Sequence, residues 1–216
     1  MLSLKREQKS KQMTSILTGD IIKSRGQKNP EIWLSQLKES LSYLEPNNKH
    51  WEIYRGDSFQ IEIKDAFKSF EAAIYIKAAI KMIKGLDVRL AIGIGEKTYQ
   101  GNDVTESNGE AFIFSGETFE TLKKEKQNLK IKTKSEILNK ELNLYFKLAL
   151  ISMDHWTVNS AEIVKLTLEN PKALQEDLGK TIGINQNAIS TRQKRANLEE
   201  ILALNGMFKK KINSLI

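Results

Sequence analysis

The sequence HWEIYRGDSFQIEIK, residues 50–64, is the stretch that decides the fold. Five apolar residues alternate with polar ones on either side of Gly56-Asp57: Trp51, Ile53, Phe59, Ile61 and Ile63. Such alternation is typical of half-buried β-strands, and a Gly-Asp pair between two of them is typical of a tight turn. The stretch therefore predicts a β-hairpin with a two-residue turn and with Asp57 at its tip.

Strands and helices are also predicted in the sequence before and after this hairpin. Residues 14–19, TSILTG, form a β-prone run that ends at Asp20. Apolar residues at helical spacing predict amphipathic helices over 30–44 and 66–84, and VRLAIGIG at 88–95 predicts another strand. The resulting order is strand, helix, strand, strand, helix, strand. This βαββαβ order is that of ferredoxin-like folds, an α+β class with an antiparallel sheet and helices on one face.

Small residues mark a close contact beyond this unit. Ala91, Gly93 and Gly95 leave one face of the 88–95 strand bare, so something packs or binds closely there. A helix predicted at 109–125 carries its own small face at Ala111, Ser115 and Gly116, which favours close packing of that helix on a sheet. NLKIK at 128–132 is typical of an edge strand.

The remaining chain is expected to be helical. Residues 134–153 carry apolar residues at helical spacing, and an all-helical composition follows from about residue 155. We therefore predict a disordered basic arm (1–12), a ferredoxin-like domain (13–133), a connecting helix (134–154) and a helix-turn-helix domain (155–216).

The composition narrows the chemistry that the chain can perform. It has no cysteine, which excludes disulfides and thiol chemistry, and its two histidines argue against histidine-rich metal sites. Carboxylate oxygens remain, and these suit magnesium better than zinc. No apolar run approaches the roughly 20 residues that span a bilayer, and the N-terminal stretch lacks the apolar segment of a signal peptide. We expect a cytoplasmic protein without a membrane partner.

The positive charge is unevenly distributed. The net charge is +7; residues 1–13 carry four basic residues and one acid, and residues 155–216 carry nine basic residues and six acids. Such an excess at the two ends favours nucleic acid as a partner, although a merely solvated surface accounts for it equally well.

Two aspartates stand where a metal site is expected. In a ferredoxin-like sheet the first strand and the hairpin are neighbours, which brings Asp20 and Asp57 to the same end. Two adjacent carboxylates repel each other and usually need a cation between them. Magnesium, bridging to the phosphates of a nucleotide, is the natural choice for such oxygen ligands. The alternative is that Asp57 is a turn residue and Asp20 a loop cap.

The segments TGDIIKSR (18–25) and EIYRGDSFQ (52–60) resemble the paired motifs of the class III nucleotidyl cyclase and GGDEF superfamily of palm-like domains. RLAIGIGE resembles the next strand of the cyclases. More specifically, residues 13–210, including TESNGEAFIFSGETFE and the C-terminal helices, resemble the bacterial SatD family. The resemblance implies that Asp20 and Asp57 bind the metal.

The chain also departs from the superfamily. RGDSF has Ser58 where a GGDEF motif carries its second acid, so metal binding is better supported than turnover. If a nucleotide binds, Arg25 and Lys97 are candidate phosphate contacts, with solvated surface charges as the alternative. In cyclases the helix that corresponds to 109–125 borders the nucleotide pocket, which makes Asn108 and Ser115 further candidates.

The C-terminal helices carry the spacing of a helix-turn-helix. Gly179 is the small residue expected where two helices cross, Gly183 allows the positive φ of the turn, and Ile189 falls at the core position of the next helix. The expected third helix, 185–196, contains no acid. Its amides and hydroxyls suit base edges and its cations suit phosphates, so we predict that it binds DNA through Gln186, Asn187, Ser190, Thr191, Arg192, Lys194 and Arg195.

Three functions account for these features. The first is a DNA-binding regulator whose N-terminal domain senses a nucleotide or mediates association, and it explains both halves of the chain. The second is a magnesium-dependent nucleotidyltransferase or cyclase that the helix-turn-helix targets. The third is a non-catalytic scaffold. A homodimer is expected because cyclase-like sites often form between protomers and because helix-turn-helix readers usually work in pairs.

Overall fold

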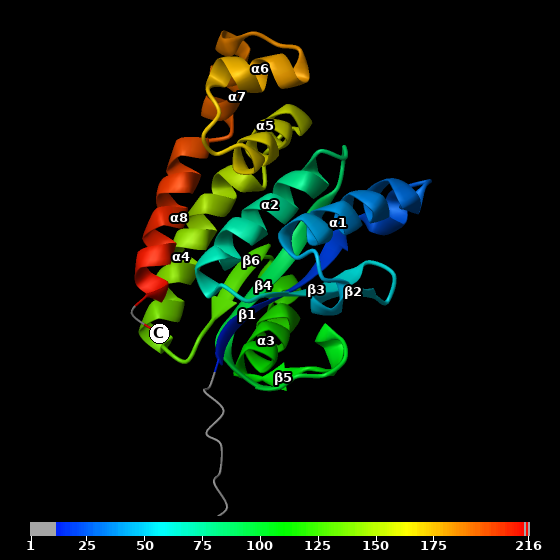
Figure 1. Cartoon of the computed structure of the whole chain (residues 1–216), viewed down its shortest axis with the longest axis vertical. Helices are drawn as coiled ribbons and strands as arrows, with labels where there is room; N and C mark the ends of the chain where they lie inside the picture. Colours follow the sequence, from blue (N-terminus) through cyan, green and yellow to red (C-terminus); the bar gives the residue numbers. More distant parts are fainter. Residues whose placement is uncertain (1–11, 214, 216) are drawn as a thin grey trace, which may run out of the picture.

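The computed structural model describes residues 12–213 and 215, and it confirms an α+β protein (Figure 1). A six-stranded sheet carries helices on both faces, and the C-terminal helices stack along one side of it. The predicted arm, residues 1–12, lies outside the described residues except for Gln12, which belongs to the first strand. Within the described part of the chain, no helix is long and apolar enough to cross a bilayer.

The sheet is centred on β1 (Gln12–Ile22), which pairs antiparallel with β3 (Ser58–Ile63) on one side and β4 (Asp87–Tyr99) on the other. β2 (Trp51–Tyr54) pairs with β3, which gives the order β2-β3-β1-β4. Two short strands share the outer edge of β4: β5 (Asn108–Gly109) pairs with it antiparallel and β6 (Leu129–Lys132) pairs with it parallel.

The hairpin prediction is confirmed, but its turn is longer than expected. Three residues, Arg55 to Asp57, separate β2 from β3. Arg55 has φ 52° and Gly56 has φ 90°, so two consecutive residues adopt left-handed backbone. Glycine takes this conformation at no steric cost, which explains Gly56 at the centre of the turn.

Asp20 lies within β1 and does not follow it, contrary to the sequence-based expectation. The ladder with β4 continues to the pair Ile22–Asp87, and Asp20 is paired with Ser58 on β3 and Arg89 on β4. Because both neighbouring strands extend this far, the backbone of Asp20 is held as extended strand. The carboxylate therefore projects from one face of the sheet, near the C-terminal end of the central strand β1.

Two helices cover one face of this sheet. α1 (Pro30–Leu44) has the predicted bounds, and the side chain of Asn29 caps it by accepting a hydrogen bond from the amide of Glu31 at 3.0 Å. α2 (Ser69–Lys81) follows a short 3₁₀ turn at Ala66–Lys68. Both helices pack on one alternating set of strand residues, which includes Leu17, Ile21, Phe59, Ile61, Leu90 and Ile92.

The other face is covered by α3 (Glu110–Glu125), so the expectation of helices on one face only is wrong. The reason lies in the bare face of β4. A Cβ added at Gly93 would lie 2.1 Å from the carbonyl oxygen of Ala111 and 2.4 Å from the amide nitrogen of Ser115. This is the close helix–sheet contact that the small residues predicted. Gly116 takes no part in it, because a Cβ there would meet no atom within 4 Å.

The C-terminal helices are α4 (Glu136–Met153), α5 (Val158–Glu169), α6 (Gln175–Ile182), α7 (Gln186–Arg195) and α8 (Leu198–Ile212). The main core crosses the boundary predicted near residue 155, since Val164 and Phe208 belong to the same cluster as Leu17. The rings of Phe70 on α2 and Phe146 on α4 stack with centroids 4.6 Å apart. The proposed division into domains stays a prediction, but the packing runs without a break from the sheet to α8.

Candidate functional site

The structure brings Asp20 and Asp57 into one cavity of about 300 Å³. The amide of Ile21 donates to the carbonyl oxygen of Asp57 at 3.1 Å, which fixes the hairpin turn beside the end of β1. The 3₁₀ turn Ser24–Gly26, which begins two residues after the end of β1, also contributes to the lining. The remaining lining includes Lys23, Ser24, Arg25, Arg89 and Lys123.

The carboxylate of Asp20 forms an ion pair with Arg89, a residue that the sequence analysis did not single out. Its Nε donates to Oδ1 at 2.8 Å, and a second guanidinium nitrogen donates to Oδ2. These hydrogen bonds, which outweigh desolvation, raise the pKa of Arg89 above its ordinary value. Position 89 shares the face of β4 with Ala91 and Gly93, so the alternation and the predicted pairing with β1 contained the signal.

The carboxylate of Asp57 also has a hydrogen-bond partner. The hydroxyl of Ser24, itself buried, donates to Oδ2 of Asp57 at 2.5 Å. The cavity thus contains four cationic side chains, Lys23, Arg25, Arg89 and Lys123, against two carboxylates. An excess of cations in a recess attracts anions.

Magnesium fits this arrangement poorly. The Arg89 guanidinium already neutralises Asp20 where the bridging cation would be needed, and a magnesium ion would have to displace it. Across residues 12–213 and 215, no group of three or more acidic, histidine or cysteine side chains is placed to hold a metal. The donor set therefore favours a phosphate or carboxylate over a cation, and the magnesium site stays a prediction.

Arg25 lies at this cavity, but Lys97 does not. Lys97 is eight residues along β4 from Arg89, about 26 Å away at the rise of a β-strand. Its Nζ donates to the buried carboxylate of Glu62 at 2.5 Å, and Glu62 also accepts from Thr14 at 3.0 Å. Burial raises the pKa of Glu62, but the hydrogen bond and the charge of Lys97 oppose this effect and outweigh it together with the other hydrogen bonds. The pKa of Glu62 therefore lies below its ordinary value. Lys97 is thus part of a buried ion pair at the other end of the sheet.

Asn108 and Ser115 are not in the cavity either. Ser115 is fully buried, because α3 turns this residue toward the sheet, and its hydroxyl lies 3.1 Å from that of Thr18. Asn108 is exposed in β5, and its side chain accepts a hydrogen bond from the amide of Gly109 at 2.7 Å. Both residues serve local structure in this arrangement.

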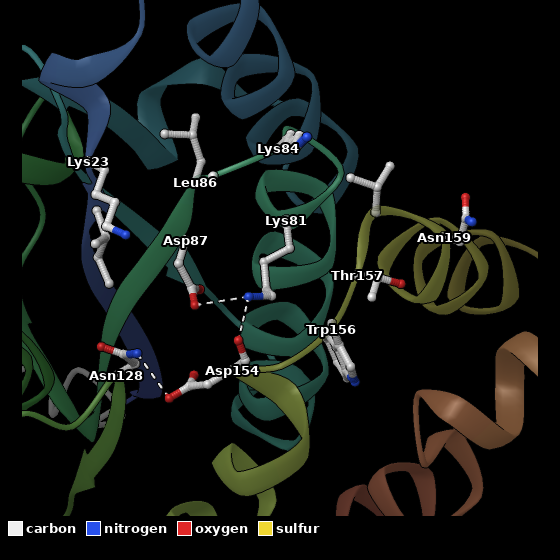
Figure 2. A pocket seen from close by; sticks show the side chains of 13 residues that line it. Lys23, Lys81, Lys84, Leu86, Asp87, Asn128, Asp154, Trp156, Thr157 and Asn159 are labelled. Atoms are coloured by element: carbon white, nitrogen blue, oxygen red, sulfur yellow. Dashed lines mark hydrogen bonds and ion pairs between the residues drawn. The ribbon is translucent and has the colours of Figure 1, made fainter.

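A second and larger cavity, of about 610 Å³, adjoins the first and shares Ile22 and Lys23 with it (Figure 2). Lys81 reaches across it to Asp87 at 3.2 Å and to the backbone of Asp154 at 2.7 Å. The buried Lys77 pairs with the carboxylates of both residues, Asp87 at 2.7 Å and Asp154 at 2.6 Å. The two exposed lysines at the rim are Lys23 and Lys84, and the apolar walls include Leu86, Trp156 and Val158.

This cavity also touches the segment that fixes α7. The indole of Trp156 donates to the carbonyl oxygen of Ala196, the C-cap of α7, at 2.9 Å. Thr157 caps the start of α5 by accepting from the amide of Ser160 at 3.2 Å. The guanidinium of Arg192 on α7 then pairs with Glu162 on α5 at 2.5 Å. A continuous set of contacts therefore runs from the wall of the cavity to α7.

α6 and α7 are joined by a three-residue turn, 183–185, and this turn packs closely on α6 at Gly179. A Cβ added at Gly179 would lie 2.4 Å from the carbonyl oxygen of Ile184, and Gly183 has φ 71°. Ile189 is fully buried with Ile163 and Leu178 in a small separate core. Gly183 and Ile189 thus have the expected turn conformation and burial, whereas Gly179 lies against the turn and not against α7.

The predicted DNA-binding residues divide into two groups on α7. Ser190 and Arg192 are half-buried, and Arg192 is held by Glu162. Five others are exposed: Gln186, Asn187, Thr191, Lys194 and Arg195. Positions 187, 191 and 195 follow one another at four-residue spacing, so they lie along one exposed stripe of the helix.

No protein-family model matches the chain, and no curated protein matches it. The resemblance to the SatD family and to cyclase-like domains stays a prediction.

Proposed function

We propose that this protein is a cytoplasmic DNA-binding regulator, in which α6 and α7 form a helix-turn-helix and α7 lies in the major groove. The observation that carries the proposal is the α6–turn–α7 geometry. The close packing of the turn on Gly179, the left-handed Gly183 and the buried Ile189 support a helix-turn-helix. The recognition helix of that motif contacts base edges through its N-terminal residues.

The chemistry of α7 supports the same function. Gln186 and Asn187 stand exposed at its N-terminus, and an exposed amide is able to bond adenine at two positions. Lys194 and Arg195 stand exposed at its C-terminal end, where cations suit backbone phosphates. α7 has no acidic residue to repel them.

The N-terminal part is proposed to be a ferredoxin-like, palm-like sensor of an anionic ligand such as a nucleotide. Its strand order, β2-β3-β1-β4 with antiparallel neighbours, supports this fold. The phosphates would bind among Lys23, Arg25 and Lys123, and the larger adjoining cavity would receive the rest of the ligand. The contacts from Trp156 and Glu162 to α7 supply a physical route from ligand to DNA-binding helix.

A magnesium-dependent nucleotidyltransferase is the alternative that Asp20 and Asp57 in one cavity suggest. The bidentate contact of Arg89 with Asp20 weighs against it. A third function, a scaffold without catalysis, would leave the cationic cavity and the acid-free face of α7 unexplained.

DNA binding is testable by fluorescence anisotropy with mixed-sequence duplex DNA at several salt concentrations. The variant Lys194→Ala/Arg195→Ala is expected to weaken binding and to reduce the slope of log K against log salt by about 0.9 for each lost phosphate contact. The matched control is Lys38→Ala, which removes an exposed charge from α1. Equal affinity and equal slope for the α7 variant and the wild type would overturn the proposal.

A further inference from the structure

The two cavities described above adjoin at the C-terminal end of β1 and differ in the helix that contributes cations to them. The smaller one extends toward α3, because Lys123 lines it. The larger one extends toward α2, because Lys81 lines it. Ile22, the last residue of β1, and Lys23 line both cavities. A single ligand can therefore reach both recesses across the end of β1.

The larger cavity has an excess of cations of its own. Lys23 lies on one side of it, and Lys81 and Lys84 lie on the other (Figure 2). Two carboxylates also line the cavity, but the buried Lys77, which is not part of the lining, pairs with both of them. The three lysines of the lining are thus left with a surplus of positive charge, and a surplus of this kind in a recess attracts anions.

Lys81 offers a hydrogen-bond donor from a nearly buried position. Only 9% of its side chain is exposed. Its ammonium has three N–H groups, of which one points to Oδ2 of Asp87 at 3.2 Å and another to the carbonyl oxygen of Asp154 at 2.7 Å. Among the residues that the structure describes, these two are its acceptors, so one N–H remains for a ligand. Because burying an ammonium is costly unless its donors are used, an anionic acceptor in this cavity would be stabilising.

Lys23, the charged residue common to both cavities, has an unusual backbone conformation. Its φ of 66° and ψ of 19° are left-handed, which few residues with a β-carbon adopt. Backbone of this kind is concentrated at ligand-binding sites. The side chain is exposed and, within the described part of the chain, forms no ion pair. The fold therefore holds an uncompensated charge at the point where the two cavities meet.

We propose that the ligand carries two separate anionic groups, such as a nucleoside with phosphates at its 3′ and 5′ positions, and lies across the end of β1. One phosphate binds between Arg25 and Lys123 on the α3 side, and the other binds Lys81 and Lys84 on the α2 side. This inference rests on the proposed anion sensor and names the class of its ligand. A ligand with one anionic end would leave one of the two cation sets without a counter-charge.

Isothermal titration with adenosine 5′-monophosphate and adenosine 3′,5′-bisphosphate isolates the second phosphate, because the two probes share one nucleoside. The bisphosphate is expected to bind about 10-fold more tightly, as one additional charge-assisted hydrogen bond would give. Lys84→Ala is expected to remove most of this gain and to leave the affinity for the monophosphate unchanged. Arg25→Ala is expected to weaken the binding of both probes, since both carry the phosphate on the α3 side.

Two further variants complete this comparison. Lys81→Met removes the buried donor and is expected to act as Lys84→Ala does, with circular dichroism as the check on folding. Because Lys84 is exposed, its replacement keeps the test valid if Lys81→Met does not fold. The matched control is Lys38→Ala, which removes an exposed lysine of α1 that lines neither cavity and is expected to bind both probes as the wild type does.

The outcomes separate this inference from the sensor on which it rests. If pyrophosphate binds but the bisphosphate binds no more tightly than the monophosphate, the proposed sensor remains and the ligand with two anionic groups is wrong. If Lys84→Ala weakens both adenosine probes equally, the two cation sets do not hold separate phosphates, and the inference is overturned. If neither pyrophosphate nor the adenosine probes bind, the anion sensor itself is overturned, and this inference with it.

Discussion

Replacing Gly93 with alanine would place a Cβ where the backbone of α3 already lies. The added carbon would approach the carbonyl oxygen of Ala111 to 2.1 Å and the amide nitrogen of Ser115 to 2.4 Å. Carbon atoms in favourable contact are about 3.5–4.0 Å from their neighbours, so α3 would have to retreat from β4 by more than about 1 Å. No side-chain rotation relieves the contact, because both opposing atoms belong to the main chain.

The net change in the free energy of unfolding follows from three terms. Overpacking of a well-packed contact costs about 1–3 kcal/mol. Retreat of α3 also breaks the hydrogen bond between Thr18 and Ser115, for about 1 kcal/mol. The lower backbone entropy of unfolded alanine returns about 0.5–1 kcal/mol. We therefore expect Gly93→Ala to lower the free energy of unfolding by about 2–3 kcal/mol, and Tm by roughly 5–10 °C.

Urea unfolding followed by circular dichroism measures this change, and Gly116→Ala is the matched control. Gly116 lies on the same helix, where an added Cβ meets no atom within 4 Å, so this variant is expected to be more stable by about 0.5–1 kcal/mol. If Gly93→Ala were as stable as the wild type, α3 would not pack on the bare face of β4 as described.

Three further substitutions test separate parts of the structure. Because the folded pKa of Glu62 lies below its ordinary value of 4.5, its contribution to stability is present above that pH and lost as the pH falls through the lowered pKa. Glu62→Gln removes the charge that pairs with Lys97 and is expected to lower the free energy of unfolding by about 3 kcal/mol at neutral pH. In urea titrations the variant is expected to lose less stability than the wild type as the pH falls. An unchanged dependence of stability on acid pH would refute the ion pair. Ile189→Ala is expected to cost about 3 kcal/mol in the same assay by emptying the small core under α6 and α7, whereas Ile189→Val costs about 1 kcal/mol; equal costs would refute that core. Arg25→Ala is expected to weaken pyrophosphate binding about 10- to 100-fold in isothermal titration, which corresponds to one charge-assisted hydrogen bond; undiminished affinity would place the anion elsewhere.

The sequence predicted the local elements well, because their signals are local. The alternation around Gly56-Asp57 and the helical spacing of apolar residues over 30–44 determine structure within a few residues. The spacing of Gly179, Gly183 and Ile189 predicted a tight turn between two helices for the same reason. Each of these features depends on neighbours in the chain and not on distant partners.

The composition of the cavity was harder to predict, because it depends on register between strands. Arg89 reaches Asp20 only because the β1–β4 ladder pairs these two positions. Lys97 lies on β4 eight positions after Arg89. At this distance it pairs with Glu62 instead. Ser115 was expected to border a ligand, yet the same small-residue face that was recognised in the sequence turns it into the sheet.

The packing partners of the C-terminal helices could not be predicted from the sequence either. A composition change near residue 155 suggested a separate module, but Phe208 on α8 packs with Phe70 on α2 at a centroid distance of 5.6 Å. Such contacts join residues more than a hundred positions apart, and no pattern within either helix specifies its partner.

The central claim, that α7 reads DNA in the major groove, is tested most directly by methylation protection on a duplex selected from random sequence. Guanine N7 lies in the major groove, so its reaction with dimethyl sulfate reports occupancy of that groove. We predict protected guanines in the selected site, and loss of that protection in Asn187→Ala/Thr191→Ala at equal folding stability. Failure to select any sequence, or protection that is unchanged in the variant, would contradict the claim.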